Sequence, residues 1–312
     1  MSKVHVGLVG VGNCASSLVQ GVEFYRGGDY PDSAGFAVGD VVFTTAFDVT
    51  PSKIGKDLSE AIRAAPNNAA VFAEVPHLGV RVEEGVLGED FGDLEDARGS
   101  ATPQAVAERL RATGTHVLVS FLPVGHQRTT ELYAEAALLA GCAFVNCMPA
   151  VLARSAEWAG RFEAAGLPLV GDDLKSQFGS TLVHRALVDT LTRAGVRLRD
   201  TYQLNAGGNM DFRAMRDPAR MAGKKATKAK GMSAEGNVHV GAEYIPFLAD
   251  RKIAYIRLEG EAFGGTTMEI ELRMSVEDSP SAAGNVLEAV RQARRAMLEG
   301  RSGVLDVGVM KA

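Results

Sequence analysis

Four lysines lie close together in one short segment of this 312-residue chain: Lys224, Lys225, Lys228 and Lys230. Lysine is otherwise scarce, because only ten of the 33 basic residues are lysines. Crowded ammonium groups repel one another, which lowers their pKa values and lets an amine exchange protons. The same groups can stabilise an oxyanion or bind a phosphate. A solvated basic loop is the usual explanation of a charge run, but the scarcity of lysine favours a chemical role.

The N-terminal segment has the pattern of a dinucleotide-binding turn. The apolar run 4–9 predicts a buried strand, and Gly10-x-Gly12-x-x-Ala15 follows it at the start of a helical pattern. The first glycine permits a tight turn, the second lets the backbone approach a pyrophosphate, and the alanine allows close helix packing. The N–H groups at the helix start would hold the anion. The residues of this turn that we expect to bind the cofactor are Gly10, Gly12, Asn13 and Cys14. The alternative interpretation is a glycine-rich turn of an ordinary α/β protein, with no cofactor.

An acidic residue closes the next apolar segment. The run 41–47 predicts a second strand, and Asp48 follows it directly. A carboxylate at this place suits the hydroxyls of the adenosine ribose and repels a 2′-phosphate, which favours NAD over NADP. The alternative is that Asp48 only helps to start the next helix, although Thr50 and Pro51 already supply a cap and a first-turn proline.

Helical and strand patterns alternate through the first half of the chain. Helical patterns cover 53–64, 103–113, 127–140 and 155–165, and further strand patterns cover 115–122, 143–147 and 167–170. This alternation predicts a doubly wound parallel sheet, which binds ligands beyond the carboxyl ends of its strands. Segments 26–40 and 82–100 are expected to be surface loops. Besides the glycine turn and Asp48, the strand ends expected to face the cofactor are those with Leu122, Pro123 and Asp173.

The pattern changes after a helix expected at 178–194. Strand-like segments follow at 197–205, 238–240, 253–259 and 268–276, and several alternate polar and apolar residues, as antiparallel strands with one open face do. A last helix is expected at 282–298. The sequence therefore predicts an α/β chain with a doubly wound Rossmann domain at 1–175, joined by the returning segment 281–312. A second α+β domain at 176–280 carries a largely antiparallel sheet.

The composition argues against several other classes of protein. The net charge is −5, so nucleic acid is not an expected partner. No apolar run approaches membrane-spanning length and no signal peptide is visible, so we expect no membrane partner and a cytoplasmic location. The three cysteines have neither the spacing of a disulfide framework nor that of a zinc site, and we expect no metal.

Five further motifs carry a resemblance that runs nearly from end to end. They are GDDLKSQ at 171–177, GGNMD at 207–211, KKxxK at 224–228, LEGEAFG at 258–264 and EDSPSAAG at 277–284. Together with the N-terminal GVGNCASSLVQGVE, they make the chain resemble the myo-inositol-1-phosphate synthase family in its shorter bacterial form. The combination of GDDLKSQ, GGNMD and KKxxK is much more specific than the glycine turn.

The resemblance implies an enzyme that uses tightly held NAD without net redox change. Hydride leaves carbon 5 of an open-chain hexose 6-phosphate, an enolate closes the ring in an intramolecular aldol step, and the hydride is returned. By default glucose 6-phosphate becomes 1D-myo-inositol 3-phosphate. The family also suggests a homotetramer built through the sheet of the second domain.

The family's site residues transfer onto matching positions of this sequence. The resemblance implies that Lys224, Lys228, Lys252 and Lys311 bind substrate and stabilise oxyanions or relay protons. It places Asp173 and Asp278 in segments that border the nicotinamide. It places the remaining site residues, including the catalytic candidate Asp211, in the substrate-binding loops: Ser176, Gln177, Asn209 and Asp211.

Some departures leave the particular sugar open. The loop 26–40 and the segment between Lys228 and Lys252 are short, the chain ends just after Lys311, and Gly223 and Ala226 replace residues usual in the lysine motif. One alternative is a fructose 6-phosphate cyclase that makes a five-membered cyclitol phosphate for a carbocyclic natural product. A further alternative is an ordinary NAD-dependent dehydrogenase, which would usually use a single Lys or His as its base.

Overall fold

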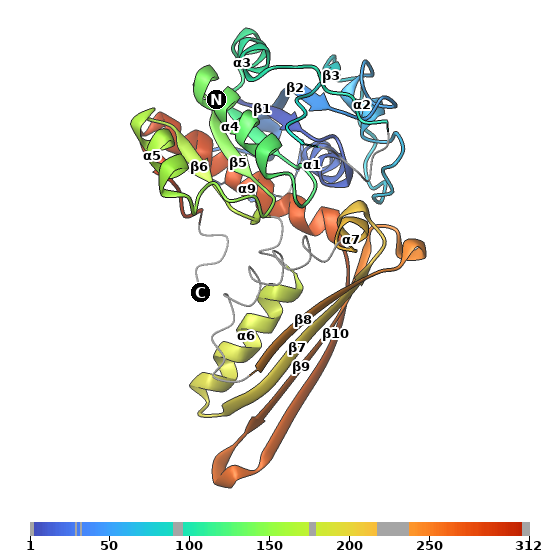
Figure 1. Ribbon diagram of the computed structural model, residues 1–312, viewed down its shortest axis with the longest axis vertical. Helices are drawn as coiled ribbons and strands as arrows, with labels where there is room; N and C mark the ends of the chain where they lie inside the picture. Colours follow the sequence, from blue (N-terminus) through green and yellow to red (C-terminus); the bar gives the residue numbers. More distant parts are fainter. Residues whose placement is uncertain are drawn as a thin grey trace. The chain divides into compact units, whose positions relative to one another are not determined.

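The chain forms two compact units, shown in the ribbon diagram of a computed structural model (Figure 1). The structure describes residues 3–28, 30–31, 33–89, 96–174, 179–216 and 237–307. The first unit combines Met1–Lys175 with Ala282–Ala312, and the second is Ser176–Ser281.

A seven-stranded parallel sheet is the centre of the first unit, counted over the described residues. The strands lie in the order β11-β6-β5-β4-β1-β2-β3, and all neighbours are parallel. Because the order reverses at β1, the carboxyl ends of β1 and β4 flank the crevice where such sheets bind ligands. The strands are β1 (Val4–Val9), β2 (Val41–Asp48), β3 (Val82–Glu84), β4 (Val117–Ser120), β5 (Ala143–Asn146), β6 (Pro168–Val170) and β11 (Gly303–Val304).

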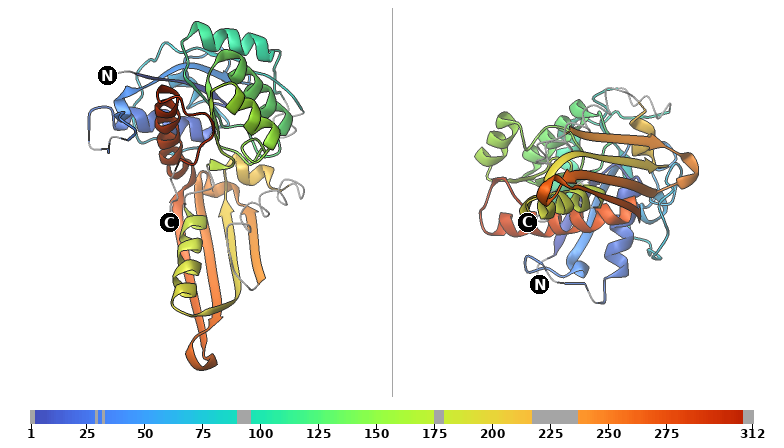
Figure 2. Two further views of the ribbon diagram at one scale, coloured as in Figure 1. Left: turned by 90° about the vertical axis from the view of Figure 1, so that its left-hand side faces the viewer. Right: turned by 90° about the horizontal axis from the view of Figure 1, so that it is seen from below.

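Helices cover both faces of this sheet, as a doubly wound fold requires (Figure 2). On one face α1 (Asn13–Phe24) and α9 (Asp278–Leu298), which starts in the second unit, contribute to one apolar cluster. On the other face lie α3 (Pro103–Ala112), α4 (Gln127–Ala140) and α5 (Ala156–Ala164). Alternate residues of β4 enter the two clusters, so both faces of the strand are buried, which explains its continuous apolar run.

The second unit is a four-stranded mixed sheet with one helix on one face (Figure 2). The strands β7 (Arg197–Gly207), β8 (Asn237–Tyr244), β9 (Arg251–Glu261) and β10 (Thr267–Glu277) lie in the order β10-β9-β7-β8. Helix α6 (Ser180–Arg193) buries Val188 against Ile256 and Leu258 of β9. The connections between strands include α7 (Met210–Ala214), η3 (Pro246–Leu248) and η4 (Phe263–Gly265).

The fold class is confirmed, with one correction to the second sheet. The pairs β7–β9 and β9–β10 are antiparallel, but β8 runs parallel to β7. More than twenty residues separate the end of β7 from the start of β8, which is long enough for the crossover that a parallel pair needs. Alternation of polar and apolar residues does not encode that direction.

Three local expectations are wrong in the first unit. The helix expected at 53–64 is reduced to α2 (Leu58–Ala61), because the Asp57 side chain caps it by accepting the Ser59 N–H. The segment 82–100 was expected to be a loop, but it begins with β3, whose Val82 is fully buried. The segment 26–40 includes η1 (Val38–Asp40) and buries Phe36 and Val38 in the core.

All three cysteines lie within the described residues, are buried and form no disulfide. Burial raises the pKa of the Cys142 thiol to about 12, so it stays protonated. No helix among the described residues is long and apolar enough to cross a membrane.

Candidate active site

The glycine turn lies between β1 and α1 with the geometry that its sequence pattern predicts. Gly10 has φ +82°, and a Cβ there would lie 3.1 Å from the Phe121 carbonyl oxygen, so the turn passes close to the end of β4. Gly12 is the N-cap of α1, and no acidic residue lies in the first helical turn. A Cβ on Gly12 would meet nothing within 4 Å. The space beside Gly12 is therefore open, as an approaching pyrophosphate requires.

Asp48 ends β2 and makes its contacts inside the protein. Its Oδ2 accepts the Val11 N–H at 2.6 Å, and its Oδ1 accepts the Thr50 N–H at 2.8 Å. The residue is only 7% exposed. Two carboxylate oxygens offer about four acceptor positions, so a ribose hydroxyl can still bind. Asp48 does not start a helix, because α2 begins only at Leu58.

Lys53 and Asn67 complete a buried cluster with Asp48 that the sequence analysis missed. The Lys53 ammonium donates to the Val11 carbonyl and to Asn67 Oδ1, both at 2.9 Å, and lies 3.8 Å from Asp48 Oδ2. Lys53 is 3% exposed, and burial lowers its pKa, while the nearby Asp48 charge opposes that shift. The signal in the sequence was a lysine outside the basic run, five residues after the predicted ribose-binding acid.

The other predicted cofactor residues of the first unit lie along the same end of the sheet. The Asn13 side chain is hydrogen-bonded to Asn68 and Ala69, so it joins the start of α1 to the loop after α2. Cys14 lies in the first turn of α1, and its side chain packs in the core. Beyond β4, Leu122 is buried and Pro123 is half-buried; beyond β6, Asp173 is 2% exposed and its N–H donates to the Met148 carbonyl.

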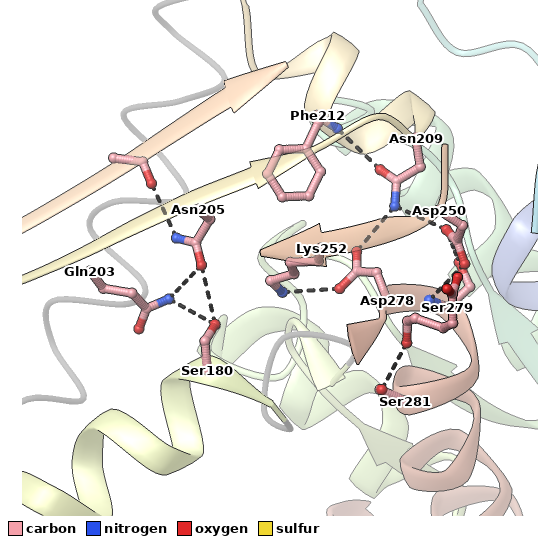
Figure 3. Close-up of polar contacts among 12 residues, drawn as sticks. Ser180, Gln203, Asn205, Asn209, Phe212, Asp250, Lys252, Asp278, Ser279 and Ser281 are labelled. Carbon is pink, nitrogen blue, oxygen red and sulfur yellow. Dashed lines mark hydrogen bonds and ion pairs between the residues drawn. The ribbon is translucent and has the colours of Figure 1, made fainter. Parts of the chain in front are cut away.

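In the second unit, Lys252, Asp278 and Asn209 are in direct contact (Figure 3). The Lys252 ammonium lies 3.0 Å from Asp278 Oδ1, and Asn209 Nδ2 donates to Asp278 Oδ2 at 3.1 Å. Their side chains come from β9, the first residue of α9 and the N-cap of α7. The Lys252 and Asp278 side chains are 13% and 12% exposed, so the charges are partly shielded from water but can be reached. The negative charge of Asp278 also suits the N-terminus of α9.

Asp250 holds this cluster from the buried side, a role that the sequence pattern does not predict. Its Oδ1 accepts Asn209 Nδ2 at 3.1 Å and the Ser279 hydroxyl at 2.8 Å, and its Oδ2 accepts the Ser279 N–H at 3.1 Å. Asp250 is 1% exposed and Ser279 is fully buried. Asn209 therefore bridges two carboxylates, one buried and one at the surface of the cluster (Figure 3).

Gly208, directly before Asn209, explains how the Asn209 side chain reaches both carboxylates. A Cβ on Gly208 would lie 2.6 Å from the Ala249 nitrogen and the Ile245 oxygen, so only glycine fits there. This close approach brings the start of α7 against the segment that leads into Asp250. Asp211 lies in the first turn of α7 and is half-buried.

A second polar cluster lies on the same face of the sheet as Lys252. Asn205 pairs with Ala254 in the β7–β9 register, two residues from Lys252 on β9, so their side chains emerge on one face. Gln203 Nε2 donates to Ser180 and Asn205 at 2.9 Å (Figure 3). This buried amide cluster fixes the start of α6 against β7.

The remaining predicted site residues lie outside the described residues. These are the catalytic candidates Lys224, Lys228 and Lys311 and the substrate-binding candidates Ser176 and Gln177. Over the residues that the structure does describe, no group of three His, Cys, Asp or Glu side chains is placed to hold a metal ion.

Fold and site together define a class: a Rossmann-type α/β protein with a glycine turn, and a second unit whose mixed sheet presents a lysine–carboxylate–amide cluster. The family described as Myo-inositol-1-phosphate synthase matches residues 179–279, a range that includes every residue of that cluster. Inositol-3-phosphate synthase of Corynebacterium glutamicum is 42% identical over 327 residues, covering 97% of this chain and 90% of the relative. The enzyme of the same name from Mycolicibacterium smegmatis is 41% identical with the same coverage.

A solved structure agrees with these relatives. The crystal structure of a protein named Ari2 superposes with a TM-score of 0.83 at 36% identity and covers 97% of this chain and 90% of that one. The chain belongs to the inositol-3-phosphate synthase family.

The hydrogen bonds of Asp250 lead to a stability prediction. In Asp250→Asn the new amide must place its NH₂ against either the Ser279 N–H or the Asn209 NH₂, so a buried donor loses its acceptor. We expect the free energy of unfolding to fall by about 2 kcal/mol in chemical denaturation. The matched control is Asp200→Asn, an exposed strand residue that accepts from Asn237, which should change it by less than about 0.5 kcal/mol. Equal effects of the two substitutions would contradict the assigned role of Asp250.

Proposed function

We propose that the chain is an NAD-dependent, redox-neutral cyclase that converts a hexose 6-phosphate into a cyclitol phosphate. By default it converts glucose 6-phosphate into 1D-myo-inositol 3-phosphate. The observation that carries the proposal is the 42% identity to a named inositol-3-phosphate synthase, which extends over 97% of the chain. This places it among isomerase-class enzymes of inositol biosynthesis.

The first unit suits a dinucleotide. The open space beside Gly12, the uncapped start of α1 and the absence of an acid in its first turn fit a pyrophosphate. Asp48 would accept a ribose hydroxyl and repel a 2′-phosphate. When bound, NAD supplies a hydride acceptor that later acts as donor, so a sugar carbon is oxidised and then reduced with no net change.

The second unit suits the proton and oxyanion chemistry of a ring closure. An ammonium has three N–H donors, and over the described residues Lys252 uses one of them on Asp278. The others can stabilise an enolate or alkoxide oxygen as negative charge develops. Asp278 keeps the ammonium in place, and Asn209 in turn orients the Asp278 carboxylate. Lys252 can also exchange a proton with the substrate, which an arginine could not do.

The proposal gives further roles to residues beyond this cluster. Lys224, Lys228 and Lys311 would add cations for the phosphate and the developing oxyanions. Ser176, Gln177 and Asn209 would bind the substrate, and Asp211 would act beside Asn209. Asp173 and Asp278 would border the nicotinamide.

A homotetramer is part of the same proposal. The face of the mixed sheet opposite α6 carries Leu204, which is 41% exposed, and Tyr255, which is 47% exposed. These two residues are directly opposite one another on β7 and β9. Adjacent exposed apolar side chains on a sheet face are typical of a subunit interface.

Separate incubations with glucose 6-phosphate and fructose 6-phosphate test the proposed reaction. We expect an inositol phosphate from glucose 6-phosphate, identified by NMR, with many turnovers per NAD and no stoichiometric NADH. A five-membered cyclitol phosphate formed only from fructose 6-phosphate would establish the alternative cyclase. Net NADH formed one-for-one with product would instead identify a dehydrogenase, and consumption of neither sugar would overturn the proposal.

Lys252 supplies the second test of the proposed function. Lys252→Ala should retain the fold and NAD binding, while turnover falls by about 100-fold or more, the scale for losing one preorganised electrostatic group. Lys252→Arg should not restore turnover, because a guanidinium does not release a proton at neutral pH. The control is Arg251→Ala, since the neighbouring side chain is 60% exposed and points to the other face of β9. Near-native turnover in Lys252→Arg would show that Lys252 acts only through its positive charge and not by proton transfer.

A further inference from the structure

Both peptide groups that flank Val11, the middle residue of the glycine turn, are held by side chains. The Val11 N–H donates to Asp48 Oδ2 at 2.6 Å. The Val11 carbonyl accepts the Lys53 ammonium at 2.9 Å and Asn67 Nδ2 at 3.0 Å. Three side chains, one from the last residue of β2 and two from the segment after it, therefore fix a turn that lies between β1 and α1.

The direction of the Val11 carbonyl determines the direction of the next N–H. In a trans peptide the C=O and N–H bonds point to opposite sides. Because the carbonyl points to the buried Lys53, the Gly12 N–H points away from that cluster. A Cβ on Gly12 meets no atom within 4 Å, so the turn faces open space at this residue.

We propose that Lys53 is a positioning residue for the pyrophosphate of the dinucleotide, acting by holding the Val11 carbonyl so that the Gly12 N–H is aimed at the anion. The inference rests on the proposed use of NAD and deepens it. Lys53 does not touch the cofactor, since it is 3% exposed beneath the turn.

The same contacts decide between two uses of the Lys53 charge. A lysine shortly after the ribose-binding acid could instead bind a 2′-phosphate and favour NADP. Its ammonium donates two hydrogen bonds inside the protein, to Val11 and Asn67, and forms a buried ion pair with Asp48 at 3.8 Å, so its charge is directed into the protein. Lys53 is therefore a residue for binding either dinucleotide, and it gives NADP no advantage.

Burying the Lys53 ammonium costs folding free energy, so its presence beneath the turn calls for a specific role. Burial lowers the Lys53 pKa, which shows that the site disfavours the charge, and the Asp48 carboxylate offsets only part of that effect. A methionine would fill the same volume without that cost. The retained ammonium is explained if the fixed carbonyl is needed for binding.

Isothermal titration calorimetry of NAD and NADP on the apo protein tests the inference. Lys53→Met should weaken NAD binding by about 10-fold to 100-fold, the range for a hydrogen bond to a charged group. NADP, already the weaker ligand, should lose affinity by the same factor. Lys56→Met is the matched control, because Lys56 lies in the same turn with an exposed side chain, and it should bind NAD as the wild type does.

A second variant keeps the test decisive if Lys53→Met fails to fold. Asn67 is only half-buried, and Asn67→Ala removes one hydrogen bond to the Val11 carbonyl and one acceptor of Lys53. It should weaken NAD binding by about 3-fold to 10-fold with the thermal midpoint nearly unchanged.

Three outcomes would contradict the inference. Unchanged NAD affinity in both variants would show that the turn needs no such support. A loss confined to NADP in Lys53→Met would make Lys53 a phosphate-binding residue. A wild-type protein that does not bind NAD in the calorimeter would contradict the proposed function itself, and the inference with it.

Discussion

The ion pair between Lys252 and Asp278 is the interaction on which the second unit's chemistry depends. A carboxylate partner stabilises a charged amine in a partly shielded site, and that carboxylate in turn needs hydrogen-bond donors of its own. Asn209 supplies one such donor and is itself held by buried Asp250. The Lys252 ammonium is therefore held through a series of contacts that begins at buried Asp250 and passes through Asn209 and Asp278. The same series of contacts joins β9, α7 and the first residues of α9. These elements must therefore be folded before the Lys252 ammonium is held in its position.

The first unit uses the same principle for a different purpose. There, the buried lysine is not offered to a ligand but fixes a backbone carbonyl, and its partner Asp48 fixes the preceding N–H. Charged side chains thus fix the backbone of a turn whose two glycines have no side chains to restrain it. In the proposed function, one unit presents a charge to the substrate, and the other uses charge to orient neutral backbone donors.

The sequence predicted what depends on local pattern. Buried apolar runs located β1, β4 and β5, and α4 has the predicted bounds, because burial on both sheet faces and helical periodicity are visible in neighbouring residues. The direction of β8 could not be predicted, since it depends on a crossover rather than on alternation. The helix expected at 53–64 is shortened to α2 because Asp57 caps it, and the same carboxylate accepts the backbone N–H groups of residues 78 and 80, a contact made across a loop. Asn209, Lys252 and Asp278 are predicted from motifs, whereas the roles of Lys53 and Asp250 depend on Val11 and Ser279, which lie 42 and 29 residues away in the sequence.

In the proposed reaction, one bound cofactor removes a hydride and returns it within a single catalytic cycle. The most direct measurement uses the hexose 6-phosphate that the protein consumes, deuterated at carbon 5, and follows the label by NMR and mass spectrometry of the product. If the cofactor returns the same hydride, the deuterium is retained on the corresponding ring carbon of the product. Loss of the label to solvent, or its transfer to free NAD in solution, would contradict it.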